Sequence, residues 1–158
     1  MPGWPSGGPS NLTAADDFGA IAYGKLRDAD LAAVFCRHEL GGSRATADAV
    51  TGTSYQDAFN YRDFIIPDAA SAGAVWVAEV ELVCENAATT ITPRIRNITD
   101  SSDAVVGAAC AATTWGGTNS YQTLSFTPVV GKRYRLQFIK SDDVYGCWGV
   151  GAMRRTNA

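Results

Sequence analysis

The sequence predicts an all-β fold: an antiparallel, jelly-roll-like β-sandwich that follows an extended N-terminal arm. From about residue 55 onward, apolar and polar residues alternate with a period of two, which is the pattern of half-buried strands. Turn-forming residues separate these runs at intervals of roughly 10–15 residues, as in sandwiches and barrels. Such intervals leave no room for the helical crossovers that join parallel strands. We therefore expect antiparallel strands.

Residues 1–12 form the predicted arm. The opening MPGWPSGGPS holds three prolines and three glycines, which disfavour the interiors of helices and strands. Trp4 is the expected anchor of the arm, because burying an aromatic side chain of ~150–250 Å² contributes up to several kcal/mol. Trp4 can dock either on its own domain or on a neighbouring subunit. Together with Pro5 and Leu12, it makes up the contacts that the arm is predicted to form with a partner.

Residues 13–54 are expected to hold an irregular or helical segment, a first strand and a loop. Asn11 or Thr13 can cap a short helix, although two glycines in the turns that follow weaken it. Small and polar residues from position 41 onward predict the loop. The sandwich proper is predicted over residues 55–158, in a chain long enough for one domain with its own core.

The strongest strand signal lies in residues 75–85. Trp76, Val80 and Leu82 alternate there with Glu79 and Glu81, so that one face is apolar and the other acidic. The same alternation predicts further strands at residues 91–96, 121–127 and 133–138, and a glycine-rich last strand at 145–153.

Two of these strands contain residues that interrupt regular pairing. Pro93 lacks a backbone N–H, which predicts an edge position or a bulge for its strand. Gly146, Gly149 and Gly151 predict close approach of another part of the chain, or a bulge near Trp148.

The composition excludes several classes of protein. Charged residues make up 18% of the 158 residues, against about 25% in soluble domains, and a neutral surface suits association. A net charge of −3 argues against sequence-independent binding of nucleic acid. No apolar run reaches the ~18 residues of a membrane span, and the first residues do not resemble a signal peptide. We therefore expect no membrane or nucleic-acid partner, and synthesis in the cytoplasm.

The candidate catalytic residues are few. His38 is the single histidine and stands outside any known nucleophile or zinc motif. Glu79, Glu81 and Glu85 share one strand face, where a solvated surface is favoured over a glycosidase pair. The sequence therefore predicts a protein that is not an enzyme and that holds no cofactor or metal.

The cysteines and the carboxylates of the predicted turns are expected to have structural roles. The cysteines are spaced singly, at Cys36, Cys84, Cys110 and Cys147, and are expected to be buried thiols rather than disulfides or zinc ligands. Asp100, Asp103, Asp142 and Asp143 fall in predicted turns, where turn formation is favoured over calcium binding.

Aromatic residues near glycine-rich loops are the better functional candidates. Trp115 lies in TTWGGTNSY, which ends at Tyr121, and Trp148 lies in VYGCWGVG. Such rings can stack on a sugar or fill a pocket of a partner protein. Trp115 and Tyr121 are predicted partner contacts, and core packing remains open for Trp115. For Trp148 a place in the core is favoured.

Three segments together resemble the β-sandwich domains of tailed-bacteriophage virion proteins: TTITPRIRNITDSSDAVVG, YQTLSFTPVVGKRYRLQFIKSDD and YGCWGVGAMRR. The resemblance spans about residues 74–155. It implies a structural virion protein, such as a capsid decoration protein or a tail-fibre domain, without catalytic residues. Its expected partners are the major capsid protein or another virion protein, and copies of itself in a homotrimer. A carbohydrate-binding module or a receptor-binding fibre domain, which would hold a glycan with the loop tryptophans, is the alternative.

Overall fold

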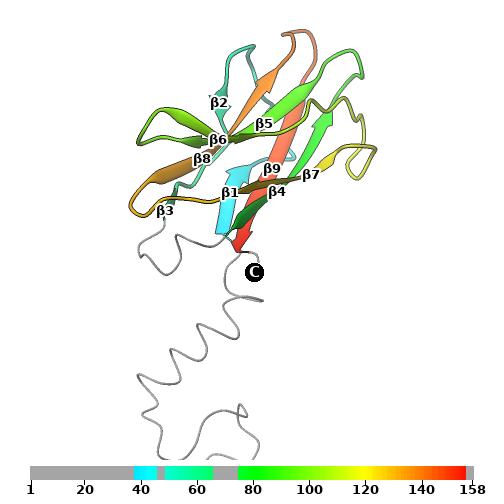
Figure 1. The fold of residues 1–158 in the computed structure, drawn as a ribbon. Helices are drawn as coiled ribbons and strands as arrows, with labels where there is room; N and C mark the ends of the chain where they lie inside the picture. Colours follow the sequence, from blue (N-terminus) through cyan, green and yellow to red (C-terminus); the bar gives the residue numbers. More distant parts are fainter. Residues whose placement is uncertain (1–37, 46–48, 66–74, 156–158) are drawn as a thin grey trace, which may run out of the picture. The chain divides into compact units, whose positions relative to one another are not determined.

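The computed structural model describes residues 38–45, 49–65 and 75–155. These residues form two antiparallel sheets that pack face to face, with no helix among them (Figure 1). The predicted antiparallel sandwich is therefore confirmed, whereas its jelly-roll connectivity stays a prediction. The arm with Trp4, Pro5 and Leu12, and the possible short helix, lie outside the described residues.

Sheet A has four strands and sheet B has five. Sheet A runs in the order β1 (His38–Gly42), β9 (Cys147–Arg155), β4 (Trp76–Cys84) and β7 (Tyr121–Phe126). Sheet B runs in the order β2 (Gln56–Asp57), β8 (Arg133–Lys140), β5 (Ile91–Asn97) and β6 (Ser102–Val106), and β3 (Phe64–Ile65) also pairs with β8. The strands expected from residues 75–85, 91–96, 121–127 and 133–138 are all present.

The core lies between the sheets and follows from the alternation. In β8, Tyr134, Leu136 and Phe138 are buried while the residues between them are more exposed. Val80 and Leu82 of β4 are fully buried on the facing sheet. The inward side chains of both sheets are removed from water, and this burial of apolar area stabilises the sandwich.

Glycines in β9 allow the two sheets to approach closely. A Cβ atom on Gly149 would stand 2.6 Å from the Phe138 ring, and one on Gly151 would stand 2.5 Å from Cδ2 of Leu136. The predicted close approach is confirmed. The alternative of a bulge near Trp148 is wrong, because β9 pairs with β4 in continuous register. The irregularity lies instead in β1, between Glu39 and Gly41.

Pro93 does not mark an edge strand. Strand β5 lies between β8 and β6, so the expected edge position is wrong. The ladder to β6 begins one residue later, at Arg94, and the Pro93 carbonyl accepts a hydrogen bond from Gly107 N–H. Pro93 therefore lies just outside this ladder, between it and the isolated bridge of Ile91 with Cys110. The shift in register occurs two residues on, between Ile95 and Arg96.

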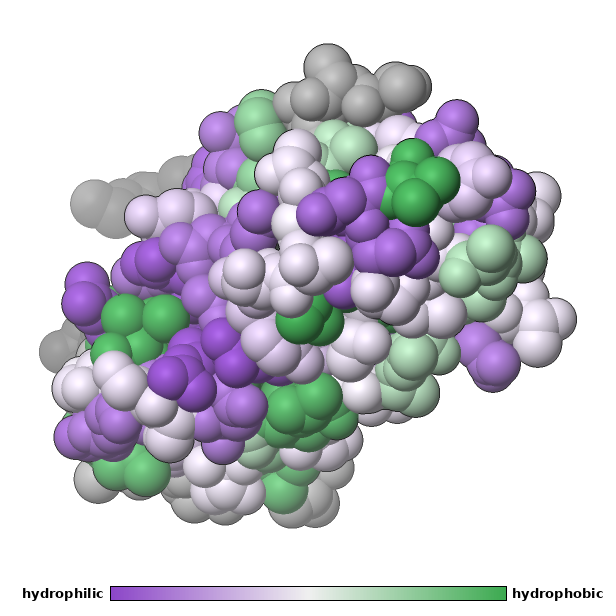
Figure 2. Space-filling model, turned by 90° about the horizontal axis from the view of Figure 1, so that it is seen from above, coloured by the Kyte–Doolittle hydropathy of each residue, from purple (hydrophilic) through white to green (hydrophobic). Residues whose placement is uncertain are grey.

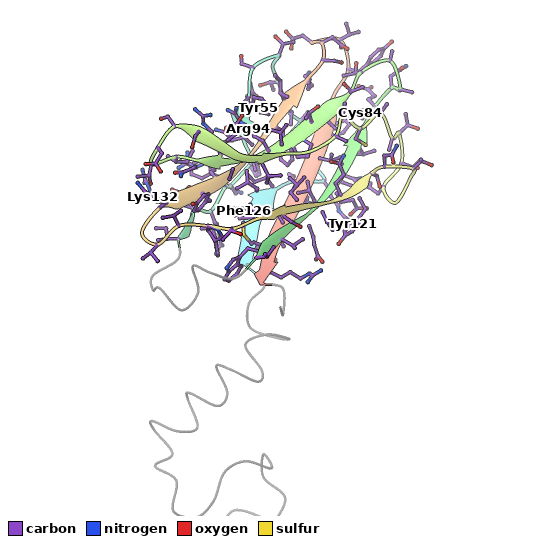
Figure 3. All side chains as sticks on the ribbon, in the orientation of Figure 1. Tyr55, Cys84, Arg94, Tyr121, Phe126 and Lys132 are labelled. Carbon is purple, nitrogen blue, oxygen red and sulfur yellow. The ribbon has the colours of Figure 1, made fainter. Side chains whose placement is uncertain are left out.

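The strand register defines two ends of the sandwich. Trp76 pairs with both Phe126 and Arg155, and His38 pairs with Met153. Strands β1 and β4 therefore begin where β7 and β9 finish, and we call this the entry end. The opposite, loop end carries the connections after β1, β4, β6 and β8. Figure 3 shows Lys132, just before β8, and Cys84, at the end of β4, far apart on opposite sides of the sandwich.

The contact between β9 and β8 can be tested with a double-mutant cycle. We expect Gly149→Ala to lower the free energy of unfolding by about 1–3 kcal/mol, because the added methyl overpacks the core against Phe138. Phe138→Leu removes the ring atoms that the methyl would meet. The double variant should therefore lose about 1 kcal/mol less than the two single losses together. Urea denaturation measures all four proteins, and additive losses would contradict the contact.

Candidate functional site

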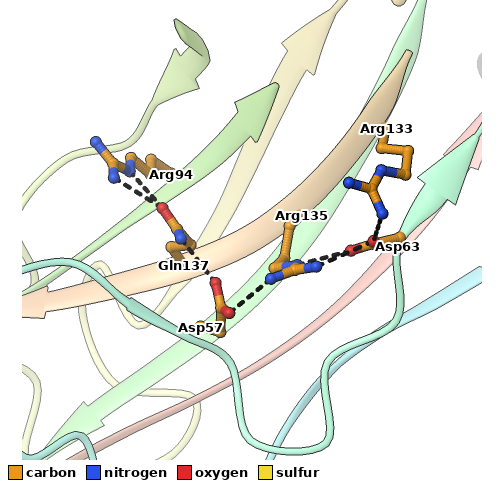
Figure 4. A network of polar contacts seen from close by, with 6 residues as sticks. All are labelled: Asp57, Asp63, Arg94, Arg133, Arg135 and Gln137. Atoms are coloured by element: carbon orange, nitrogen blue, oxygen red, sulfur yellow. Dashed lines mark hydrogen bonds and ion pairs between the residues drawn. The ribbon is translucent and has the colours of Figure 1, made fainter. Parts of the chain in front are cut away.

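The outer face of sheet B is closed by a polar network of its own side chains (Figure 4). Arg135 binds Asp63 through Nε at 2.6 Å and Asp57 through a terminal nitrogen at 2.7 Å. The hydrogen bonds that Arg135 donates to Asp63 and Asp57 raise the pKa of its guanidinium. Gln137 continues the network, donating to Asp57 at 2.7 Å and accepting from Arg94 at 2.7 Å. These bonds fasten β2 and β3 to β8.

Two tyrosines cover the arginines of this network. The Tyr55 ring lies 3.6 Å from the Arg94 guanidinium carbon, and the Tyr61 ring lies 3.7 Å from that of Arg135. Figure 3 shows Tyr55 beside Arg94 on sheet B. Cation–π contacts of this kind hold the rings in place. The face is thus occupied by interactions within the chain.

The outer face of sheet A is hollowed. A groove of about 350 Å³ crosses it, lined by Glu39, Gly41, Gly42, Arg44, Glu79, Glu81, Tyr121, Val150, Gly151 and Ala152. We call it the sheet A groove. Its residues come from all four strands of the sheet and from the turn after β1. The volume falls within the range of small-molecule sites.

Register explains how the groove is built. Ala152 of β9 pairs with Glu39 on β1 and with Glu79 on β4. Two residues earlier, Val150 pairs with Glu81. Short side chains on β9 therefore form a floor between longer acidic side chains on the neighbouring strands.

Arg44 joins the groove to the loop end. Its guanidinium forms an ion pair with Glu81 and lies 4.8 Å from the centre of the Trp115 ring. Glu81 in turn pairs across the strands with Tyr121. Since Leu82 N–H donates to Ser120 C=O, the next pair along, Glu81 with Tyr121, is a non-hydrogen-bonded pair, in which side chains lie closest. Trp115 and Tyr121, both predicted as partner contacts, therefore come to the same region.

The glutamates of β4 and Glu85 form specific hydrogen bonds and ion pairs, whereas the sequence favoured a simple solvated face for them. Glu79 accepts a 2.6 Å hydrogen bond from Arg154 on β9, and Glu81 is bound by Arg44. Glu85 lies beyond the end of β4 and accepts from Gly146 N–H at 3.1 Å. Sequence reasoning placed the glutamates on one face but missed both arginines. Arg44 reaches Glu81 from 37 residues away, a separation that no local pattern reveals.

Trp148 is not part of the core between the sheets. The inward residues of β9 are Cys147, Gly149, Gly151 and Met153, because they pair with inward residues of β4. Trp148 therefore lies on the outer face, half-buried, with its ring 2.7 Å from where a Cβ of Gly146 would stand. The predicted core position is wrong, because apolar neighbours in sequence do not tell which face a residue takes.

The described cysteines are buried free thiols, as expected: Cys84, Cys110 and Cys147. Cys84 pairs across the strands with Cys147. A hydrogen bond with Cys147 and burial raise the pKa of the Cys84 thiol, and burial raises that of Cys110. Cys84 and Cys110 are therefore held in the protonated form, which is a poor nucleophile. No cluster of metal-ligating side chains occurs within the part of the chain that the structure describes, and the side chain of His38 lies outside that part.

The turn carboxylates bind donors of the chain itself. Asp100 accepts from Lys132 Nζ at 2.6 Å, and Asp103 pairs with Arg94 and Arg96. Asp142 accepts from the Thr89 hydroxyl at 2.8 Å and from Val144 N–H at 2.9 Å. Asp100 and Asp142 thus lie between strands, as expected from the sequence. The expected turn position of Asp103 is wrong, because Asp103 lies within β6 and pairs with Arg96 across the ladder to β5.

Comparison with family models, with curated proteins and with solved structures finds no match to this chain. Among the described residues, no helix is long and apolar enough to cross a membrane. The assignment of function therefore rests on the geometry of the sandwich and on the resemblance of its sequence segments.

Asp142 predicts a pH dependence of stability. Hydrogen bonds from Val144 N–H and Thr89 hold the pKa of Asp142 below its usual value of 3.8. The folded protein thus binds this proton less readily than the unfolded chain. The stabilisation is present above pH 3.8 and is lost as the pH falls through the lower, folded-state pKa.

We expect Asp142→Asn to make the free energy of unfolding fall less steeply below pH 3.8 than in the wild type. Asp143→Asn is the matched control, because Asp143 takes no part in the bonds to Thr89 and Val144. Urea denaturation at a series of pH values measures both. Identical slopes for the Asp142 variant and the wild type would show that these hydrogen bonds do not act on stability.

Proposed function

We propose that this chain is a structural protein of a tailed-bacteriophage virion, a capsid decoration protein that attaches to the shell through the entry end of its sandwich. The sequence resemblance supports the virion assignment, and the confirmed antiparallel sandwich agrees with it. The expected partners are the major capsid protein and further copies of the chain in a homotrimer. Binding, not catalysis, is the activity assigned.

Exposed aliphatic side chains at the entry end carry this proposal. Ile65, Val75, Val129 and Val130 are 49%, 40%, 56% and 40% exposed, and we call them the entry-end patch. Their common location follows from register, because Ile65 pairs with Arg133, while Val75 and the turn at Val129 flank the pair of Trp76 with Phe126. Apolar groups gathered at one end favour a protein interface there.

The point at which the chain enters the sandwich also supports the entry end as the attachment surface. Strand β1 begins at the entry end, because His38 pairs with Met153 near the end of β9. The residues before His38, which include the predicted anchor Trp4, therefore join the sandwich at that end. A tether that is attached at the same end as an apolar patch can engage the same surface as the patch.

The loop end has a different surface. Seen from above, the hydrophobic side chains of the molecule form small groups separated by hydrophilic ones (Figure 2). The exposed valines there are Val144, in the loop after β8, and Val106, at the end of β6, which are 74% and 48% exposed. Isolated apolar residues on such a surface are ordinary. This end therefore suits exposure to solvent while the entry end binds the shell.

The proposal is tested by co-sedimentation of the full chain with shells assembled from the major capsid protein of the same virus. Replacing Val129 and Val130 with Asp places two charges in the apolar contact. We expect at least about tenfold weaker binding, which corresponds to about 1.4 kcal/mol. Deletion of residues 1–12 should also remove binding, because it takes away the predicted tether.

Val144→Asp is the matched control, because it puts the same charge at an exposed valine of the loop end. It should bind shells like the wild type, and circular dichroism should show all variants folded. If the wild type does not bind these shells, or if the Val129 and Val130 variant binds as tightly as the control, the attachment proposal is wrong.

A further inference from the structure

We propose that the sheet A groove binds an uncharged oligosaccharide, laid across β9 with a sugar ring against Tyr121. This site lies on the outer face of sheet A, apart from the entry-end patch, and gives the protein a second binding activity beside shell attachment. Three properties of the groove carry the proposal: its shape, its hydrogen-bonding groups and its exposed aromatic ring.

The shape suits an extended, narrow ligand. Strands β1 and β4 flank β9, so their backbones stand about 10 Å apart across the groove. The floor between them is made by Val150 and Ala152, which are short, while Glu39 and Glu79 rise on either side of Ala152. The space of about 350 Å³ admits a short run of sugar rings rather than a folded peptide element.

The polar groups suit hydroxyls. Glu79 and Glu81 are each held by a guanidinium, from Arg154 and Arg44. Carboxylates have several lone-pair sites and guanidinium groups have several N–H donors, so such a pair can also bond to hydroxyls, which both donate and accept. The groove therefore presents acceptors and donors side by side, as a hydroxyl-rich ligand requires.

The charge of the groove selects against anionic ligands. The lining contains the carboxylates of Glu39, Glu79 and Glu81 and the guanidinium of Arg44. Arg154, which is not part of the lining, forms an ion pair with Glu79. Three negative and two positive groups leave a small negative balance. Phosphorylated, sulfated or sialylated ligands would be repelled, whereas a neutral sugar would not.

The aromatic ring gives the groove a platform. Tyr121 is 57% exposed and lies directly across from Glu81. A ring beside a carboxylate lets one sugar ring stack on its face while hydroxyls bind the acid. Trp115 acts through Arg44, because its ring lies 4.8 Å from that guanidinium. Trp115 is thus a positioning residue, and Tyr121 contacts the ligand.

The test uses the full chain on an array of neutral and anionic glycans, followed by isothermal titration with neutral hexasaccharides of glucose, mannose and N-acetylglucosamine. We expect at least one neutral glycan to bind, and sialylated and sulfated glycans to give no signal. Tyr121→Ala should weaken the affinity at least about tenfold, as loss of a stacked ring does. Glu81→Gln keeps the shape of the side chain but removes the ion pair with Arg44, and should also weaken it.

Tyr61→Ala is the matched control. Tyr61 is also an exposed tyrosine, 45% exposed, but it lies over Arg135 on sheet B, so its loss should leave the affinity within twofold. A blank array, binding led by anionic glycans, or equal affinities of the two tyrosine variants would overturn the proposal. Shell co-sedimentation of Tyr121→Ala separates the two proposals. The fraction of this variant that sediments with shells should equal that of the wild type. A lower fraction would show that the groove binds the shell and not a glycan.

Discussion

The absence of side chains at two positions of β9 determines the arrangement of this sandwich. Gly149 and Gly151 face the core, where Phe138 and Leu136 of the opposite sheet occupy the space that a Cβ would need. Because strand side chains alternate, this inward pair fixes which residues of β9 point outward. A slip of one residue would drive Val150 and Ala152 into those core side chains. The sheet-to-sheet contact therefore also sets the floor of the sheet A groove.

The two outer faces differ because of what each sheet carries beside its core residues. On sheet B, Arg135 and its carboxylate partners satisfy one another and hold the short strands β2 and β3 in place. On sheet A, Arg44 and Arg154 bind glutamates at the sides of a hollow. The paired charges cover the outer face of sheet B. On sheet A they surround a hollow, where their hydrogen-bonding groups can reach a ligand. This difference is the physical basis for assigning ligand binding to sheet A.

Local patterns were sufficient for most of the fold. Strands β4, β7 and β8 have six or more residues each, so the period of two is visible within each strand. Strands β2 and β3 have two residues each, too few to show a period, and they exist through their pairing with β8. Trp148 was misplaced for a related reason: the apolar residues around it lie on both faces of β9.

The candidate site was predictable only in part. Trp115 and Tyr121 stood out as aromatic residues near glycines, but their common location depends on Arg44, which contacts both the Trp115 ring and Glu81. Arg44 comes from the turn after β1, and pairings between distant segments are not encoded in local spacing. The arm with Trp4, on which the tether depends, lies outside the described residues.

The most direct test of this account is an electron cryomicroscopy map of virus particles that carry the chain. We expect sandwich-shaped density on the outside of the shell, with the turn at Val129 and Val130 against the capsid protein and the groove beside Tyr121 open to solvent. Density in which the groove is buried against the shell while the entry end faces outward would contradict it.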